Sequence, residues 1–272
     1  MGCAKVDAGA GPGGNGDAGA SSDGTSLADA PVVVDIPIRG EVGSVIGDDG
    51  GDLGLNCTRA LHAVIRDFKG IMTNAMDVKH PDFDVPVVSE QGIVGPMIGA
   101  DQKPIYAAPA TSMLMHGADL FAQWYRDVPD VNLRFEIDLA LTPHATKPGT
   151  FVYDNDMYFP IDDRGFGNQY QSHNFHFTSE LHFRFPYRGG EEFTFRGDDD
   201  LWLFVNGHLA IDLGGVHIAQ MGTVKLDEKA AAFGIVPNNT FQMDIFHAER
   251  HPSDSTFHIE TTLQCIDNVV IP

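Results

Sequence analysis

The sequence is short of positive charge: 17 lysine and arginine residues stand against 38 aspartate and glutamate residues, a formal net charge of −21 at pH 7. Nucleic acids and anionic membrane surfaces repel a chain with this balance of charge. We therefore expect no nucleic-acid partner, and contact with a membrane only through a lipid tether. An acidic chain is well suited to solubility and to the binding of cations.

Long apolar runs are also lacking, because no stretch approaches the roughly 20 apolar residues that a membrane-crossing helix needs. Met1-Gly2 leads directly into Cys3, so the sequence predicts no signal peptide ahead of this cysteine. Segments with helical periodicity are few, and 30 glycines and 16 prolines divide the chain into short pieces. These features favour many short strands, and a hydrophobic content of 43% is ample for their core.

The sequence does contain a clear β-hairpin. Leu201 to Val205 are five apolar residues in a row, which suits a strand that is covered on both faces. Asn206-Gly207 is the pair best suited to a two-residue hairpin turn, and His208 to Asp212 is the expected returning strand. Aromatic-rich or alternating segments predict further strands at 63–68, 133–141, 151–161, 175–185, 241–246 and 257–263.

One helix is expected in residues 116–126, where Leu120, Phe121 and Trp124 fall on one face. In this position Trp124 fits a core anchor better than a platform for a sugar ring. Residues 86–110 are rich in proline and glycine and are expected to form a loop. Together the segments predict an all-β protein, an antiparallel β-sandwich with one short helix and long loops.

Three consecutive aspartates, Asp198, Asp199 and Asp200, come directly before the buried strand of the hairpin. Two carboxylates about 4 Å apart repel by about 1 kcal/mol in water and by about 4 kcal/mol at the effective dielectric of a protein surface. Calcium, which takes about six to eight oxygen ligands, would offset this repulsion. A solvated acidic turn is the alternative interpretation.

The stretch around these aspartates, GDDDLWLFVNGHLAIDLGGVH, resembles the signature of the fibro-slime domain family. That family is related to the lectin-like β-sandwich of the anthrax protective antigen, which also occurs in flocculin-type adhesins. The resemblance implies a jelly-roll-like sandwich of the protective-antigen lectin type. Weaker matches follow in the expected order: RDF at 66–68, HPDF at 80–83, QWYRDVPDVN at 123–132, HNFHFTSEL at 173–181 and HAERHPSDSTFHIETTL at 247–263.

The resemblance also implies a binding site. In the adhesin relatives, two successive aspartates joined by a cis peptide bind calcium, and hydroxyl groups of a sugar complete the coordination. The matching positions are Asp198 and Asp199, with Asp200 as a further metal ligand. The later loop at 250–256 has no asparagine where the adhesins have a ligand, and it offers Asp254 instead. The residues expected to line the ligand site come from two loops: Gly215, His217, Arg250 and Ser255.

The sequence gives little support for an enzymatic function. The sequence has no Gly-x-Ser-x-Gly motif, no cysteine–histidine signature and no phosphate-binding glycine loop. Glu191, Glu192 and Glu249 could pair with the aspartates as in a glycosidase, but aspartates that hold a cation are poor proton donors. His247 and His251 have a zinc-pair spacing only on a helix, and the surrounding pattern is that of a strand. We expect a protein that is not an enzyme.

Cysteine is scarce, with three residues in all. Cys57 and Cys265 lie just outside the first and last family-like motifs, and the end strands of a sandwich often lie side by side. We therefore expect a disulfide between them, worth about 4 to 5 kcal/mol because it closes a long loop. Such a bridge would imply an extracytoplasmic location. Two buried free thiols are the alternative.

The third cysteine, Cys3, precedes a low-complexity segment. Residues 4–30 are almost wholly alanine, glycine, serine and aspartate, a composition that predicts a flexible tether. The expected organisation is thus a tether at 1–30 followed by a fibro-slime-type domain at 31–272. A cysteine at the head of such a tether resembles the mature end of a bacterial lipoprotein, in which the cysteine is lipidated. An incidental free thiol is the alternative.

These predictions combine into a calcium-dependent adhesion module of the cell surface or extracellular matrix, secreted or lipid-tethered, with a glycan or matrix polysaccharide as its partner. Few protein carboxylates imply weak calcium binding, with a dissociation constant on the order of 10⁻⁴ to 10⁻³ M. The alternative is a structural matrix protein that self-associates into fibres, in which calcium only stabilises a loop.

Overall fold

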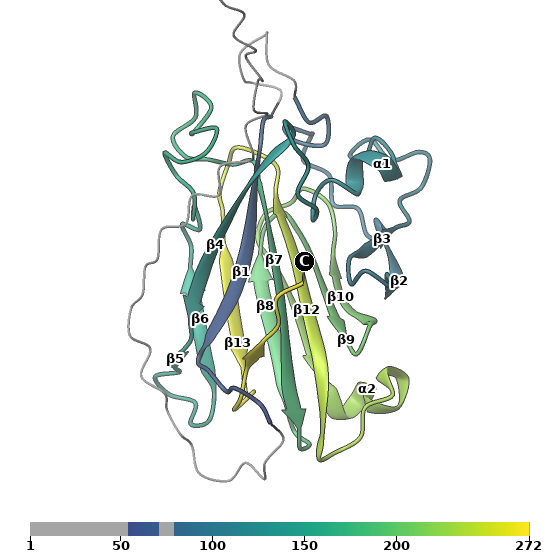
Figure 1. The fold of residues 1–272 in the computed structure, drawn as a ribbon, viewed down its shortest axis with the longest axis vertical. Helices are drawn as coiled ribbons and strands as arrows, with labels where there is room; N and C mark the ends of the chain where they lie inside the picture. Colours follow the sequence, from purple (N-terminus) through teal and green to yellow (C-terminus); the bar gives the residue numbers. More distant parts are fainter. Residues whose placement is uncertain (1–53, 71–78, 272) are drawn as a thin grey trace, which may run out of the picture. The chain divides into compact units, whose positions relative to one another are not determined.

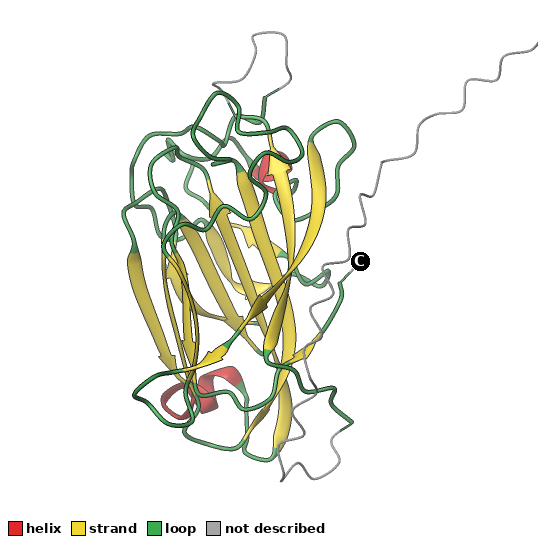
Figure 2. Ribbon diagram, turned by 90° about the vertical axis from the view of Figure 1, so that its left-hand side faces the viewer, coloured by secondary structure: helices red, strands yellow, loops and turns green. Residues whose placement is uncertain are grey.

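The computed structural model describes residues 54–70 and 79–271. In these residues two antiparallel sheets pack against each other around a shared apolar core, with two short helices (Figures 1 and 2). The all-β sandwich expected from the sequence is confirmed. The predicted tether at 1–30, with Cys3, lies outside the described residues. No helix of the described ranges is long and apolar enough to cross a membrane.

The larger sheet has nine strands in the order β3-β2-β10-β9-β12-β7-β1-β4, with β14 paired to β7. Its members are β1 (Ala60–Phe68), β2 (Val94–Ile98), β3 (Pro104–Tyr106), β4 (Asn132–Ala140), β7 (Phe177–Tyr187), β9 (Asp200–Val205), β10 (His208–Leu213), β12 (Asn239–Glu249) and β14 (Asp267–Asn268). The smaller sheet has five strands in the order β11-β8-β13-β6-β5. They are β5 (Thr142–Pro143), β6 (Phe151–Asn155), β8 (Glu192–Gly197), β11 (Gln220–Lys225) and β13 (Phe257–Thr261).

The predicted hairpin is formed by β9 and β10, and its turn residues Asn206 and Gly207 have φ values of 48° and 79°. Strand β9 lies inside the larger sheet, between β10 and β12. Leu201, Leu203 and Val205 face the core between the sheets, whereas Trp202 and Phe204 face a second apolar cluster on the other side. Burial on both faces explains why this strand is continuously apolar.

Three local expectations were wrong. The stretch 86–110 is not all loop, because it contains β2 and β3, two short strands at an edge of the sheet where prolines are tolerated. The helix expected at 116–126 is the single turn α1 (Ala118–Phe121), and the second half of 151–161 forms turns after β6. A second helix, α2 (Leu226–Phe233), was not expected, since eight residues are too few for a clear periodicity.

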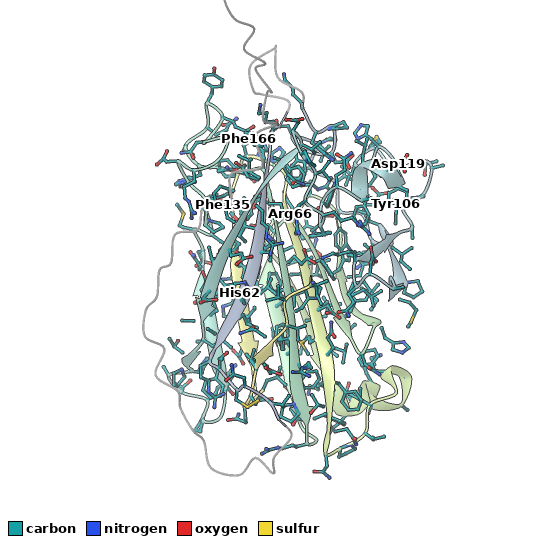
Figure 3. All side chains as sticks on the ribbon, viewed as in Figure 1. His62, Arg66, Tyr106, Asp119, Phe135 and Phe166 are labelled. Carbon is teal, nitrogen blue, oxygen red and sulfur yellow. A yellow bond between two sulfur atoms is a disulfide. The ribbon has the colours of Figure 1, made fainter. Side chains whose placement is uncertain are left out.

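Residues 80–126 form a layer beside β9 and β10: β2 and β3 extend the edge of the larger sheet, and Leu114, Phe121 and Trp124 cover its outer face. Figure 1 shows α1, β2 and β3 of this layer beside β9 and β10, and Figure 3 labels Tyr106 and Asp119 within it. Trp124 is fully buried, with its ring 6.2 Å from that of Trp202 and 5.1 Å from that of Phe121. Trp124 is thus a core anchor, as expected.

A disulfide joins Cys57 to Cys265, which confirms the predicted pairing. The chain segments beside it also pair, since the Thr58 amide donates to the Ile266 carbonyl at 2.7 Å. The bridge therefore connects the start of β1 to the last strand of the sheet, β14, across a sequence separation of 208 residues.

Candidate functional site

The three aspartates lie where two strands of the larger sheet meet two loops. Asp200 begins β9 and pairs with Ala248 near the end of β12, at the end of the sheet where α1 lies (Figure 1). The connection from β10 to β11, residues 214–219, and the loop at 250–256 both reach this point. The Asp198–Asp199 peptide is cis, as the resemblance implied.

Both loops hold the first two carboxylates through backbone amides. Asp198 Oδ1 accepts from the Thr256 amide at 2.5 Å. Asp199 Oδ1 accepts from the His217 amide at 3.3 Å, and its Oδ2 accepts from the Arg250 amide at 2.9 Å. The two aspartates are buried. The two loops predicted from the sequence therefore do lie next to Asp198 and Asp199. Their backbone amides donate hydrogen bonds to the two carboxylates.

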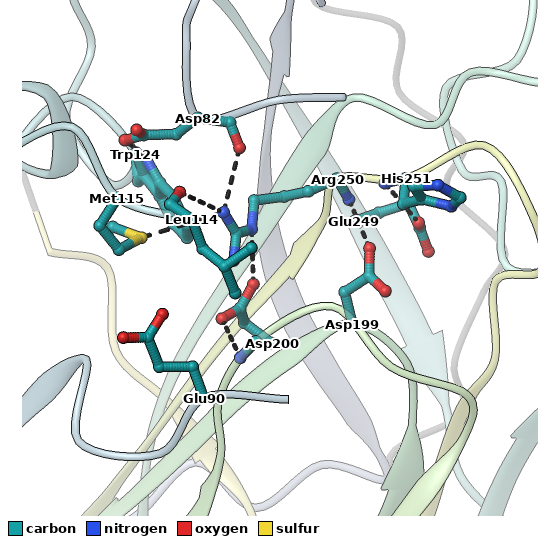
Figure 4. A network of polar contacts seen from close by, with 12 residues as sticks. Asp82, Glu90, Leu114, Met115, Trp124, Asp199, Asp200, Glu249, Arg250 and His251 are labelled. Atoms are coloured by element: carbon teal, nitrogen blue, oxygen red, sulfur yellow. Dashed lines mark hydrogen bonds and ion pairs between the residues drawn. The ribbon is translucent and has the colours of Figure 1, made fainter. Parts of the chain in front are cut away.

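Asp200 has different surroundings, because it lies against a buried cation. Its Oδ2 accepts from Arg250 Nε at 2.6 Å, and its Oδ1 accepts from the Gly215 amide at 2.6 Å (Figure 4). Neither side chain of the ion pair is exposed. Arg250 and Gly215 were expected to line a ligand site, and the structure instead has both of them hold Asp200.

The remaining predicted residues divide between the loop interior and the surface. Ser255 is fully buried and its Oγ donates to the Tyr158 carbonyl at 2.8 Å, so it fixes the loop. Both ring nitrogens of His217 face carbonyls, at 3.0 Å from Ile218 O and 3.2 Å from Leu213 O. Asp254 is exposed, and among these residues it alone offers its side chain to solvent.

Glu249 is a member of the site that the sequence suggested only as a possible glycosidase-like partner of the aspartates, not as a metal ligand. It is the last residue of β12 and fully buried, and its Oε2 finds no hydrogen-bond partner among the described residues. The alternation of residues along β12 could have indicated that Glu249 is buried. Met243 and Ile245 face the core, and the alternation of a strand puts His247 and Glu249 on the same face. An acid at the end of such an apolar row has to be satisfied locally.

The pKa values of Asp198, Asp199 and Glu249 are displaced upward. Burial raises the pKa of Asp198 to about 6, and the negative charge of Asp254 adds to the effect. Burial also raises the pKa of Asp199 to about 8, with the charges of Asp200 and Asp198 acting in the same direction. The pKa of Glu249 is raised well above its ordinary value by burial and by the two neighbouring aspartates. Folding thus favours the protonated form of these three acids, and a nearby cation would favour their ionised form.

His247 contacts the main chain of the aspartate segment at Asp198. Its ring is fully buried against Phe257, with centroids 5.3 Å apart, and its Nε2 lies 2.8 Å from the Asp198 carbonyl oxygen. Burial lowers the pKa of His247 to about 4, so the ring is neutral and Nε2–H donates to the carbonyl. His247 therefore fixes the main chain next to the carboxylates.

The donor set of Asp198, Asp199 and Glu249 consists of hard oxygens, which suits calcium better than zinc. Among residues 54–70 and 79–271, no three histidine, cysteine, aspartate or glutamate side chains converge closely enough to hold a metal ion by themselves. A calcium ion here would take further ligands from backbone carbonyls and hydroxyl oxygens, which it accepts readily. The unpartnered Glu249 Oε2 fits such an ion.

Comparisons with known proteins identify similar chains. The family model of the PA14 domain matches residues 127–269. Protein psiD of Dictyostelium discoideum is 40% identical over 187 residues, covering 64% of this chain and 36% of the relative. Protein psiQ of the same organism is 34% identical over 201 residues, covering 68% of this chain and 20% of the relative. The chain thus spans well under half the length of these relatives.

Among solved structures, the PA14 sugar-binding domain from an RTX adhesin is similar to this chain with a TM-score of 0.32 and 10% sequence identity. The match covers 78% of this chain and 94% of that domain.

Proposed function

Because the chain belongs to the PA14 domain family, we propose that it is a calcium-dependent glycan-binding module that acts in adhesion at the cell surface or in the extracellular matrix. Membership of the fibro-slime group within this family is part of the proposal. The observation that carries it is the group of buried acids Asp198, Asp199 and Glu249: the two aspartates accept hydrogen bonds from backbone amides, and one oxygen of Glu249 has no partner among the described residues.

In the proposed mechanism, Asp198 and Asp199 would hold calcium, and the unpartnered oxygen of Glu249 would be available as a further ligand. Bound calcium supplies a positive centre that accepts neighbouring hydroxyl oxygens of a sugar. The protein's part is to fix the carboxylates beforehand. The amides of His217, Arg250 and Thr256 do this for the side chains.

The two loops that hold the aspartates also carry exposed side chains next to them. Ile218 in the 214–219 connection is 83% exposed, and Asp254 projects from the 250–256 loop. We place these residues at the edge of the sugar site, where they would set selectivity. Loops on a rigid sheet commonly have this role.

The proposal is tested on a glycan array, probed with the parent protein in calcium and in chelator. We expect glycan signals that disappear in chelator. Asp199→Asn should remove both these signals and the rise in melting temperature on calcium addition, because an amide is a weaker calcium ligand than a carboxylate. Asp154→Asn, at an exposed aspartate paired with His258, is the matched control and should behave as the parent.

A blank array together with chelator-sensitive stability would contradict sugar binding and favour the self-associating matrix protein. An unchanged calcium response of Asp199→Asn would contradict the metal site. The location at the cell surface is a separate part of the proposal, supported by the Cys57–Cys265 disulfide, because such bridges persist in oxidising compartments. Thiol labelling of the protein from its native host tests it, and free cysteines at 57 and 265 would count against it.

A further inference from the structure

We infer that Arg250 is a built-in cation that balances Asp200 permanently, so that the exchangeable cation of the site is held without Asp200. The inference rests on the proposed function, since it concerns which acids remain for calcium. It assigns Arg250 as a positioning residue and removes it from the surface that a sugar could reach. It also removes Asp200 from the set of metal ligands that the sequence predicted.

The first observation is how the guanidinium of Arg250 is held. Its Nε donates to Asp200 Oδ2 at 2.6 Å, and its Nη1 donates to the carbonyls of Asp82 and Leu114, both at 3.1 Å (Figure 4). The Trp124 ring lies against it, 4.7 Å from ring centroid to Cζ. Arg250 is fully buried. A guanidinium fixed by an ion pair, two carbonyls and an aromatic face does not exchange with solvent ions.

The second observation is that the charge of Asp200 is already balanced by a buried cation of the protein. Asp200 Oδ2 is taken by Arg250 and its Oδ1 by the Gly215 amide. Asp199 accepts only from two backbone amides, and Glu249 keeps an unpartnered oxygen. The acids thus fall into two groups. Asp200 is neutralised by Arg250, whereas Asp199 and Glu249 have no ion-pair partner among the described residues.

The third observation is where the support for Arg250 comes from. Asp82, Leu114 and Trp124 all precede residue 127, at which the PA14 match begins. The Asp82 carboxylate is itself fixed, since it accepts from Trp124 Nε1 and from the His116 amide, both at 3.0 Å. The layer at 80–126 therefore holds the arginine in place. This gives a physical role to the HPDF and QWY stretches, which do not contact Asp198 or Asp199 in any described hydrogen bond.

Arg250 also couples the two groups of acids, because it contacts both through different atoms. Its amide donates to Asp199 and its side chain to Asp200, while its carbonyl accepts from the Asp84 amide at 2.8 Å. Fixing one residue thereby sets the positions of two successive carboxylates. Asp200 points to Arg250, and Asp199 is left for the exchangeable cation.

The test is a calcium titration by calorimetry of the parent protein, Asp200→Asn and the double variant Asp200→Asn/Arg250→Met. We expect the single variant to bind calcium at least about tenfold more weakly, because the unpaired buried guanidinium repels a cation nearby. The double variant removes both charges and should bind within about threefold of the parent, since no metal ligand is lost.

Glu180→Gln is the matched control, because Glu180 is the buried partner of Arg66 and Lys103 in another part of the sheet. It should lower the melting temperature and leave the calcium dissociation constant unchanged. A loss of stability alone therefore does not reproduce the expected pattern.

A folded double variant that no longer binds calcium would overturn the inference, since Asp200 would then be a ligand. If the double variant does not fold, a calcium-loaded crystal structure of the parent decides: Asp200 on Arg250 supports the inference, and Asp200 within about 2.6 Å of calcium overturns it. A parent that takes up no calcium overturns the proposed function instead. The ion pair is then tested in chelator, where equal melting of the single and double variants would refute it.

Discussion

The carboxylates at the start of β9 and the end of β12 differ in how their charge is balanced. Asp200 faces a guanidinium, whereas Asp198 and Asp199 accept from neutral amides. Burial raises the pKa of Asp198 and Asp199 to about 6 and about 8. A pKa that is raised by folding means that the folded state favours the protonated acid. Its contribution to stability is present below the unfolded pKa of about 4 and is lost as pH rises through the folded value.

This gives a pH dependence of stability that calcium should reduce. In chelator, the titration of Asp198 and Asp199 should lower the free energy of unfolding between about pH 4 and pH 8, with at most roughly 3 kcal/mol from Asp198. His247 acts in the opposite direction between about pH 4 and pH 6.5, because burial lowers its pKa to about 4, and this contribution is the same with and without calcium. With saturating calcium, the ionised acids gain a partner and the fall should be smaller. The measurement is urea unfolding across this range with and without calcium.

The difference between the two curves isolates the site, because Asp67, whose pKa burial raises to about 7, contributes to both. Asp198→Asn should make the curves approach each other around pH 6, since an asparagine does not titrate. Parallel curves for the parent protein would show that calcium does not bind these acids.

At the scale of strands and loops, the sequence was most informative where a single element carries its own pattern. The apolar run of β9 and the Asn206-Gly207 turn predicted the hairpin. A strand that is buried on both faces is continuously apolar, so it can be identified from its own residues without knowledge of its neighbours. Strands β2 and β3 escaped prediction because they are three to five residues long, and β2 is held to β10 through a single pair, His208 with Met97. Such short edges have no pattern of their own.

The roles of Arg250 and Glu249 could not be read from the sequence for a different reason. Arg250 is 50 residues from Asp200 and 168 residues from Asp82, so its partners are known only once three elements have packed. The resemblance placed Arg250 in a binding loop, where an arginine would ordinarily reach solvent. In the structure Arg250 is fully buried and paired with Asp200. The aspartate pair was found because its residues are neighbours in the chain.

The close approach of the 214–219 connection to the outer layer makes Gly215 irreplaceable. Gly215 has φ +97°, and an added Cβ would lie 2.5 Å from the Val88 carbonyl oxygen and closer still to the Glu90 amide. Both atoms are backbone and cannot move aside. We expect Gly215→Ala to cost about 3 kcal/mol or more of unfolding free energy, measured by urea denaturation.

Gly149→Ala is the control for this substitution, since Gly149 also has positive φ but nothing within 4 Å of an added Cβ. It should cost only the backbone term of about 1 kcal/mol. Equal losses for the two variants would mean that the layer and the connection are not tightly packed.

At the scale of the described domain, the site and the disulfide lie at opposite ends of β1. The Cys57–Cys265 bridge is next to Ala60, where β1 begins, whereas Phe68 ends β1 beside β7 at Phe177, which in turn pairs through Glu249 with β12. The length of the sheet separates the two. Stability and binding are therefore expected to respond independently to changes at the two ends.

Removal of the disulfide tests this separation. Cys57→Ala/Cys265→Ala opens a loop of 208 residues and should lower the free energy of unfolding by about 5 kcal/mol, because the unfolded chain gains conformational entropy. Calcium affinity, measured by calorimetry at a temperature where the variant is folded, should stay within about threefold of the parent. A large loss of affinity in a folded variant would mean that the bridge controls the site through the sheet. The rigid strands would then transmit a change at one end to the other.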